Sequence, residues 1–102
     1  MFYEKRRSII AKVILKGHII VPDVDIAAVK MELSNHIELT RQESGCLVFK
    51  VSQDTENLNR FNVYEEFADR SSFANHQDRV RQSTWGATAA NVERHYEITD
   101  AE

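Results

Sequence analysis

A period-two alternation of apolar and polar residues is the feature that most constrains how this chain folds. In residues 8–21 the odd positions are apolar or glycine, while Lys12, Lys16 and His18 occupy even positions. This period is typical of a half-buried strand, and Gly17 in its middle indicates a bulge or a close backbone approach. The same pattern predicts three further strands, at residues 46–52, 60–67 and 91–99.

The segments between these strands carry apolar residues at helical spacing. One helix is predicted from a cap at Asp23 or Asp25 through residue 40. Gly45, in the loop that follows, is the expected left-handed residue. A second helical region begins at a cap formed by Asp69 or Ser71 and leads into the last strand. The polar segment 54–59 joins the two middle strands as a hairpin.

The resulting order is β-α-β-β-α-β, which predicts an α+β fold of the ferredoxin-like type. Such a chain forms a four-stranded antiparallel sheet with both helices on one face. At 102 residues the chain is long enough for one domain, which we assign to residues 8–99. Residues 1–7 are expected to form a loose arm, and residues 100–102 a free tail.

The sheet face away from the helices is expected to be too apolar for bulk water and too polar for a core. A second copy of the chain, placed face to face, would cover it. The polar residues expected at that seam between subunits are His18, Asn62, Tyr64 and His95.

Composition narrows the possible partners. A formal net charge of -3 argues against binding to nucleic acid or to an anionic membrane. No apolar run approaches the roughly 20 residues that span a bilayer, and the N-terminus lacks the pattern of a secretory signal. The single cysteine, Cys46, excludes an intrachain disulfide. Cytoplasmic residence is therefore expected.

Two polar residues stand where the periodicity predicts core. Glu65 lies in the alternation of residues 61, 63, 65 and 67, and His76 lies on the helical stripe between Phe73 and Val80. A lone buried charge is costly, so the two side chains must meet or must face a ligand cavity. If they touch, Glu65 orients the imidazole as a base; the alternative is a buried structural pair that joins helix and sheet.

Arg94 occupies the apolar face of the last predicted strand. It would neutralise a substrate anion or, as we favour, pair with Glu65 or Glu43. Glu43 itself is interpreted as a loop cap that accepts backbone N–H bonds, and His36 as a solvated residue on the outer side of its helix. Four aromatic residues are candidates for lining a substrate cavity, although each also suits a plain core: Phe49, Phe67, Trp85 and Tyr96. Trp85 follows a predicted helix break, which suggests a lid.

Several short motifs, in this order, resemble the antibiotic biosynthesis monooxygenase family. They are Glu43-x-Gly45-Cys46, the aromatic Phe49, Tyr64-Glu65-x-Phe67 and Phe73-x-x-His76. The resemblance extends from Ile9 to Ile98, although the family commonly has tryptophan where this chain has Phe67. It implies a dimeric α/β barrel built from two such sheets, with the pocket between helices and sheet in each subunit.

The resemblance also implies a chemistry without metal or flavin, in which a deprotonated quinol or polyphenolic aromatic reacts directly with dioxygen. The expected partners are thus a small aromatic substrate, dioxygen and a second copy of the chain. In agreement, the sequence has no dinucleotide-binding fingerprint, no phosphate loop and no histidine pair with metal-ligand spacing on one helix. We therefore expect no cofactor and no metal site, with His76, Glu65 and Arg94 as candidate catalytic residues.

Other functions stay open on the same scaffold. One is a different enzyme, such as an isomerase of a small metabolite or a haem-degrading protein. Haem is disfavoured because His76 lies too early in its helix to match the histidine of the haem-degrading relatives. Another is a dimer that binds a small ligand without catalysis.

Overall fold

The computed structural model describes residues 11–101. The predicted N-terminal arm, the first residues of the first predicted strand and the last residue of the predicted tail lie outside the described residues. The elements are β1 (Lys12–Ile20), a 3-10 helix η1 (Asp23–Asp25), α2 (Ile26–Arg41), β2 (Cys46–Gln53), β3 (Arg60–Phe67), α3 (Arg70–Arg81), α4 (Thr84–Thr88) and β4 (Glu93–Ala101).

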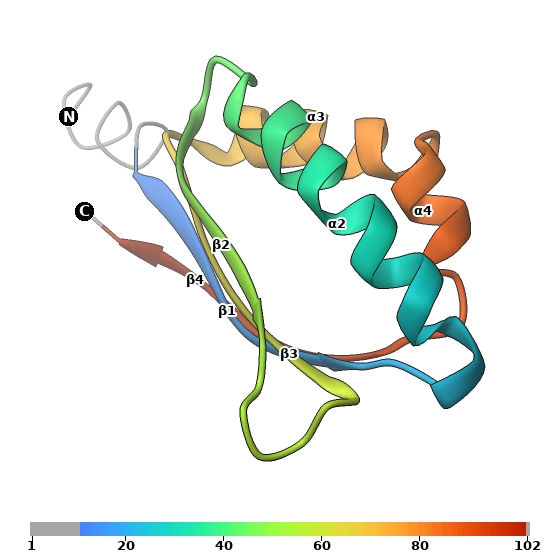
Figure 1. The fold of residues 1–102 in the computed structure, drawn as a ribbon. Helices are drawn as coiled ribbons and strands as arrows, with labels where there is room; N and C mark the ends of the chain where they lie inside the picture. The colour runs from blue at the N-terminus through green and yellow to red at the C-terminus, as the bar shows by residue number, and fades with distance from the viewer. Residues whose placement is uncertain (1–10, 102) are drawn as a thin grey trace, which may run out of the picture.

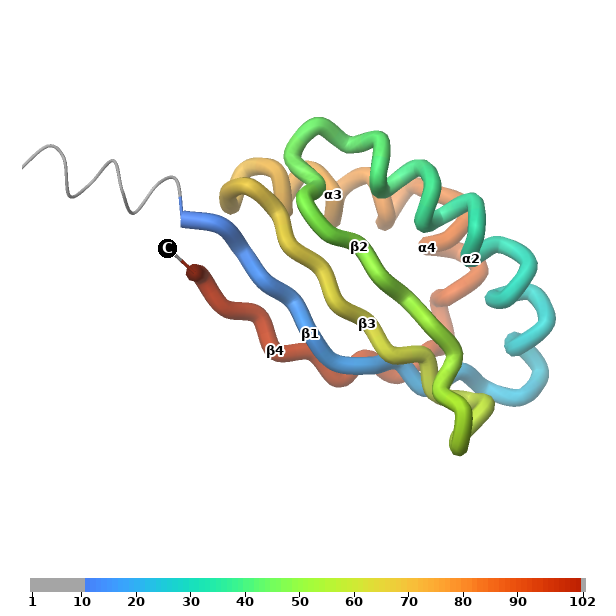
Figure 2. Tube along the Cα trace, turned by 60° about the vertical axis from the view of Figure 1, so that its left-hand side comes forward, coloured from blue at the N-terminus to red at the C-terminus, as the bar shows by residue number. Residues whose placement is uncertain are grey.

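The strands form one antiparallel sheet in the order β2-β3-β1-β4, which confirms the ferredoxin-like α+β prediction. All the helices lie on one face of this sheet (Figure 1). The strands β2 and β4 form the two edges of the sheet. Helix α2 packs against β2, so β4 lies at the edge away from that helix (Figure 2). The fold therefore has one covered face, on the helix side, and one face that the helices leave open.

The helix boundaries are set by caps that differ in part from the prediction. Asp69 caps α3, because its side chain accepts a hydrogen bond from the Ser72 amide at 2.7 Å. Ser83 caps α4 by accepting from the Gly86 amide at 3.1 Å, which explains the predicted break before Trp85. At α2, Asp25 occupies the predicted N-cap position, but its side chain makes no capping hydrogen bond, and the short helix η1 precedes α2.

Two glycines are required by close packing. Gly17 has φ of 154°, and a Cβ atom there would lie 1.9 Å from the carbonyl oxygen of His95, so the predicted close approach is confirmed. Gly45 does not adopt the predicted left-handed conformation. It is needed for another reason, because a Cβ atom at Gly45 would lie 2.0 Å from Ser72 Oγ at the start of α3. This contact brings the loop after α2 against α3.

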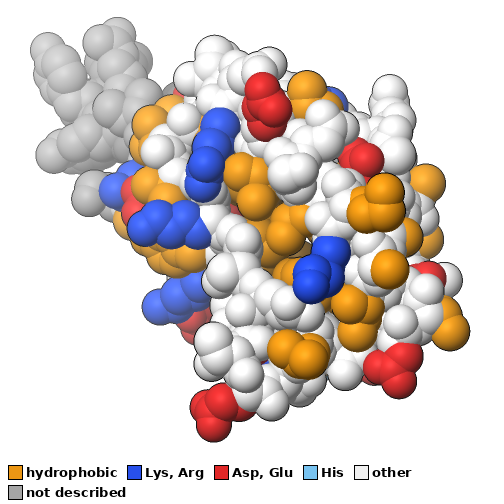
Figure 3. Space-filling model, in the orientation of Figure 1, with side chains coloured by type: hydrophobic (Ala, Val, Ile, Leu, Met, Phe, Trp, Pro, Cys, Tyr) orange, Lys and Arg blue, Asp and Glu red, His pale blue; other side chains and the backbone are white. Residues whose placement is uncertain are grey.

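The core lies between the helices and the sheet. Its largest buried side chains include Phe61 and Phe67 of β3 and Val13 of β1, each 2% exposed or less. On the outer surface, hydrophobic side chains lie among charged ones over α2 (Figure 3). Met31 of α2 is an example, at 82% exposed.

The last strand continues further than predicted. Asp100 and Ala101 belong to β4 and pair with Val13 and Lys12 of β1, so they are not part of a free tail. Residues of β4 are exposed on both faces up to Asp100. This strand is therefore held mainly by its backbone ladder with β1.

Candidate functional site

The imidazole of His76 lies at the centre of the helix–sheet layer. The residue is 5% exposed and projects from α3 toward β3, where its Nε2 atom lies 3.8 Å from Glu65 Oε1. Glu65 is also buried and points from β3 into the same layer. The ring of His76 packs against Phe67 and Phe49, with centroids 4.8 and 5.7 Å apart. The structure thus brings together the two polar residues that the sequence placed in the core.

The nearest carboxylate to His76 is not Glu65 but Glu43. Both oxygens of Glu43 lie within hydrogen-bond distance of His76 Nδ1, at 3.1 and 3.2 Å. Arg79 Nε donates to Glu43 Oε2 at 2.5 Å, and Arg79 Nη2 donates to Thr40 Oγ1 at 2.9 Å. The interpretation of Glu43 as a cap of its own loop was therefore wrong, because its side chain binds α3.

Glu65 and His76 face each other across the layer, and their pKa values are shifted in opposite directions. Burial and the nearby Glu43 carboxylate raise the pKa of Glu65 to about 8. Burial lowers the pKa of His76, and this effect is opposed by Glu43. Glu65 Oε1 has no hydrogen-bond partner within residues 11–101. At neutral pH the pair therefore consists of a neutral imidazole and a largely protonated carboxyl group.

His36 was expected in solvent and is instead 4% exposed. Its ring stacks on Trp85 of α4 at 4.5 Å and meets the edge of Phe49 at 5.3 Å. Burial, His76 and Arg79 lower its pKa to about 3, so it is neutral at physiological pH. The prediction was wrong because His36 lies seven residues after the buried Val29 and four before the buried Thr40, on the face of α2 that packs against β2 and α4.

Arg94 does not pair with either core carboxylate in the described part of the chain. It lies exposed on β4, and its Nη2 atom donates to the carbonyl of Ala89 at 3.3 Å. The favoured pairing with Glu65 or Glu43 was therefore wrong, and the arginine that Glu43 binds is Arg79. Arg94 does share the helix-side face of β4 with Tyr96, because their β1 partners are Ile19 and Gly17.

The four aromatic candidates do not share one environment. Phe49, Phe67 and Trp85 are buried around the two histidines, and Trp85 is part of the core cluster. Tyr96 is 38% exposed at the open edge of the layer. Burial and the Glu65 carboxylate raise the pKa of Tyr96 to about 12, while Arg94 lowers it in part. Tyr96 therefore lies near Glu65, on the helix-side face at the β4 edge of the sheet.

A polar pocket lies on the other side of His76, between the loop after α2 and the first turns of α3. Its volume is about 260 Å³. The lining residues are Glu43, Ser44, Gly45, Ser72, Asn75 and Arg79.

In residues 11–101, no cluster of three His, Cys, Asp or Glu side chains is placed to hold a metal ion. Within the same residues, no helix is long and apolar enough to cross a membrane.

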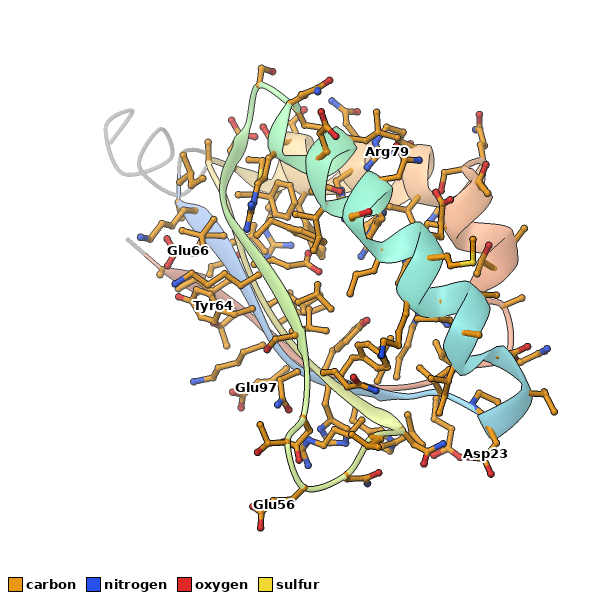
Figure 4. The ribbon with its side chains drawn as sticks, viewed as in Figure 1. Asp23, Glu56, Tyr64, Glu66, Arg79 and Glu97 are labelled. Carbon is orange, nitrogen blue, oxygen red and sulfur yellow. The ribbon has the colours of Figure 1, made fainter. Side chains whose placement is uncertain are left out.

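The residues predicted at a subunit seam share the open face of the sheet. Tyr64, Glu66 and Glu97 point away from the helices, whereas Arg79 lies on the helix side (Figure 4). His18 and His95 stack on this face with centroids 4.7 Å apart, and Tyr64 Oη donates to Glu66 Oε2 at 2.5 Å. The homodimer itself stays a prediction.

The family model described as antibiotic biosynthesis monooxygenase matches residues 21–87. The chain belongs to this family. The matched segment includes β2, β3 and most of the helical layer, and so contains Glu43, Glu65 and His76. A comparison with curated proteins finds no match.

Solved structures of similar proteins share the fold of this family member. Three are described as putative antibiotic biosynthesis monooxygenases. The protein from Nitrosomonas europaea is 22% identical, with a TM-score of 0.71 over 89% of this chain and 88% of its own. That from Deinococcus radiodurans is 27% identical, with a TM-score of 0.68 over 88% and 90%. That from Bacteroides thetaiotaomicron is 20% identical, with a TM-score of 0.74 over 90% and 89%.

The raised pKa of Glu65 makes the stability of this family member depend on pH. The native state holds the Glu65 proton more tightly than the unfolded chain, whose carboxyl group titrates near its ordinary value of 4.5. The stabilisation is thus complete below that value and is lost as pH rises to about 8. In Glu65→Gln this loss is absent. We expect the free energy of unfolding of the variant, relative to the natural protein, to improve by on the order of 3 kcal/mol between pH 5 and 9.

Urea denaturation of both proteins at pH 5, 7 and 9 measures this difference. The matched control is Glu56→Gln, which makes the same substitution in the exposed loop between β2 and β3. A pH-independent difference for Glu65→Gln would show that Glu65 titrates normally.

The sequence interpretation missed Arg79, Thr40 and the role of His36 in this site. One signal was present for Arg79, because residues three apart on a helix share a face and Arg79 follows His76 by three. Thr40, which is fully buried at the end of α2, lies three residues after Ile37 on the apolar stripe of the helix, so the pattern pointed to its burial but not to its partner. Its role depends on how two helices meet, and a helical pattern does not specify this.

Proposed function

We propose that this protein is a monooxygenase that oxidises a quinol or a polyphenolic aromatic with dioxygen, without a metal or flavin. The observation that carries the proposal is the buried pair of His76 and Glu65, with Nε2 and Oε1 3.8 Å apart among aromatic rings. Their surroundings push the two pKa values in opposite directions, toward a free base and a protonated acid. Such pairs are typical of acid–base sites.

In the proposed reaction, His76 Nε2 accepts the phenolic proton as the O–H bond breaks. The electron-rich ring carbon of the resulting anion reduces dioxygen and forms a C–O bond to it. The proton held on His76 then returns to the outer oxygen, and as the O–O bond breaks the attacked ring carbon loses its own C–H proton, which completes the water molecule. One oxygen atom stays on the ring, the other leaves as water, and the hydroquinone becomes a hydroxyquinone.

The other candidate residues would bind the substrate. Glu65, protonated at neutral pH, would donate a hydrogen bond to a substrate oxygen, which its unpartnered Oε1 atom favours. Phe49 and Phe67 would pack against the aromatic ring. Tyr96 and Arg94, on the uncovered side of the layer, would be the first groups that an entering substrate meets, with Arg94 compensating its developing charge. Trp85, stacked on His36, would close the far end of the layer.

The proposal includes a homodimer and a cytoplasmic setting. The open sheet face carries apolar Ile14 and Ile20 beside a polar network that includes the ion pair of Lys12 and Glu66 at 2.9 Å. A second copy of this face would cover the apolar residues and provide partners for the polar ones. The cytoplasmic setting is supported by the single cysteine, which leaves no intrachain disulfide to form in an oxidising compartment.

Oxygen uptake with a panel of reduced naphthoquinones and benzoquinones tests the function. We expect uptake above autoxidation in the presence of a metal chelator, with a hydroxyquinone as product and one labelled oxygen atom from ¹⁸O₂ in its ring. Autoxidation is distinguished by its products, the parent quinone and hydrogen peroxide. No protein-dependent uptake across the panel, or uptake that yields only peroxide, would contradict the proposal.

A further inference from the structure

The Nδ1 atom of His76 has closer polar contacts than the Nε2 atom, which would face the substrate. Both oxygens of Glu43 face this nitrogen, at 3.1 and 3.2 Å. The carboxylate is held in turn by Arg79 Nε, and the same guanidinium is anchored to the buried hydroxyl of Thr40. Residues of α2, the loop after it and α3 thus converge on one ring nitrogen.

This arrangement determines where the imidazole proton lies. A carboxylate that binds a guanidinium is an acceptor and has no proton to donate. The His76 nitrogen facing it must therefore carry the hydrogen, which leaves the other nitrogen unprotonated. We infer that Glu43, which is held by Arg79 while Thr40 anchors that arginine, is a positioning residue that fixes the Nδ1–H tautomer of His76 and keeps Nε2 free toward Glu65.

The catalytic meaning of this inference rests on the proposed function, but the tautomer does not. If His76 is the base, Nε2 must be unprotonated before the substrate proton arrives, and Glu43 stabilises the imidazolium ion that forms. The groups that bear on this equilibrium are Glu43 from the loop, Arg79 on α3, Glu65 on β3 and His36 on α2. Of these, Glu43 is the one that favours the charged imidazole, whereas Arg79 and burial oppose it.

A purely structural role is the competing explanation for these contacts. In that case Glu43 only ties the loop after α2 to α3, and the state of the imidazole is incidental. The packing of Gly45 against Ser72 already joins the same two segments without any charge. The side chains also become more exposed outward, from 6% for His76 to 19% for Glu43 and 31% for Arg79. The carboxylate therefore adds an ionic connection from the buried ring to the polar pocket.

The tautomer is measured directly by long-range ¹H–¹⁵N correlation spectra of the ¹⁵N-histidine-labelled protein, with the His76 signals assigned through His76→Gln. We expect the natural protein to show the Nδ1–H form of His76 at pH 7. We expect the Glu43→Gln variant to titrate His76 at lower pH, because the charge that favours the imidazolium is lost. An Nε2–H form in the natural protein, or an unchanged His76 titration in Glu43→Gln, would overturn the inference.

The matched control is Glu56→Gln, which removes the same charge. Glu56 lies in the β2–β3 loop, far from Arg79 (Figure 4), so its variant should leave the His76 titration unchanged. Should Glu43→Gln not fold, Arg79→Gln loosens the clamp while it keeps the carboxylate. His76 is then expected to titrate at higher pH, because the positive charge of Arg79 lowers its pKa. A His76 titration unchanged in Arg79→Gln would also overturn the inference.

Activity provides an independent readout that separates this inference from the proposed function. With an accepted quinol, Glu43→Gln should lower kcat on the order of 100-fold and change KM little, because Glu43 acts through His76 rather than on the substrate. A structural role would instead lower the fraction of folded enzyme and leave the pH profile of that fraction unchanged. If no quinol is oxidised, the proposed function fails, while the spectra still decide the tautomer.

Discussion

The His76→Gln variant is expected to oxidise a quinol between 100- and 10,000-fold more slowly than the natural protein, within the range that a general base contributes. Glutamine fills a similar volume and can still donate a hydrogen bond from its amide nitrogen to Glu43, but it cannot take up the phenolic proton. The effect should fall on kcat, because Phe49 and Phe67 would still bind the ring. Oxygen uptake under saturating quinol measures it.

Asp78→Asn is the control for this experiment. Asp78 lies on the same helix, is exposed and pairs with Arg81 rather than with a buried group. Circular dichroism and thermal unfolding should show that both variants are folded. If His76→Gln is folded and keeps more than about a tenth of the activity, His76 is not the base, and the buried pair is structural.

Gly17→Ala is expected to lower the free energy of unfolding by about 3 kcal/mol or more. The backbone at Gly17 has φ of 154°, and the new methyl group would lie 1.9 Å from the His95 carbonyl oxygen and 3.1 Å from Tyr96 Cα. Both of these atoms belong to the backbone of β4, so no side-chain rotation relieves the contact. The two strands must separate, and hydrogen bonds of their ladder are lost.

Urea denaturation at pH 7 measures this loss, with Thr99→Ala as the control. Thr99 lies on β4 opposite Ile14 and is exposed, so its replacement should change the free energy of unfolding by about 0.5 kcal/mol or less. A loss below about 1 kcal/mol for Gly17→Ala would mean that β1 and β4 adjust to a side chain more easily than their spacing indicates.

Local patterns predicted the strands well because side chains along a strand alternate between the sheet face that packs on the helices and the face that does not. The limits of β3 were predicted to the residue, at 60–67, since its buried and half-buried residues alternate without exception. The first turn of α3 was equally predictable from Asp69. The ends of β4 were less so, because this edge strand continues to pair for as long as β1 is present beside it, whatever its side chains.

The candidate site was predictable only in part. Glu65 and His76 were recognisable because each breaks an apolar pattern. Glu43 and Arg79 break no pattern, since each lies in a polar stretch where a charge is expected. What assigns them to His76 is the approach of the loop after α2 to α3, a tertiary contact made possible by Gly45. Sequence spacing indicates which residues are unusual, but it does not indicate which ordinary residues will be their partners.

The exposure of β4 on both faces has a consequence for how molecules reach the interior of a single chain. A strand that buries few side chains detaches at lower free energy than one in the middle of the sheet. Amide hydrogens of β4 should therefore exchange with solvent earlier than those of β3. Detachment of β4 carries Tyr96 and Arg94 away from the layer that holds Glu65, so a ligand can enter while the helices stay packed. The rate of ligand exchange would then be set by the rate at which β4 detaches from β1.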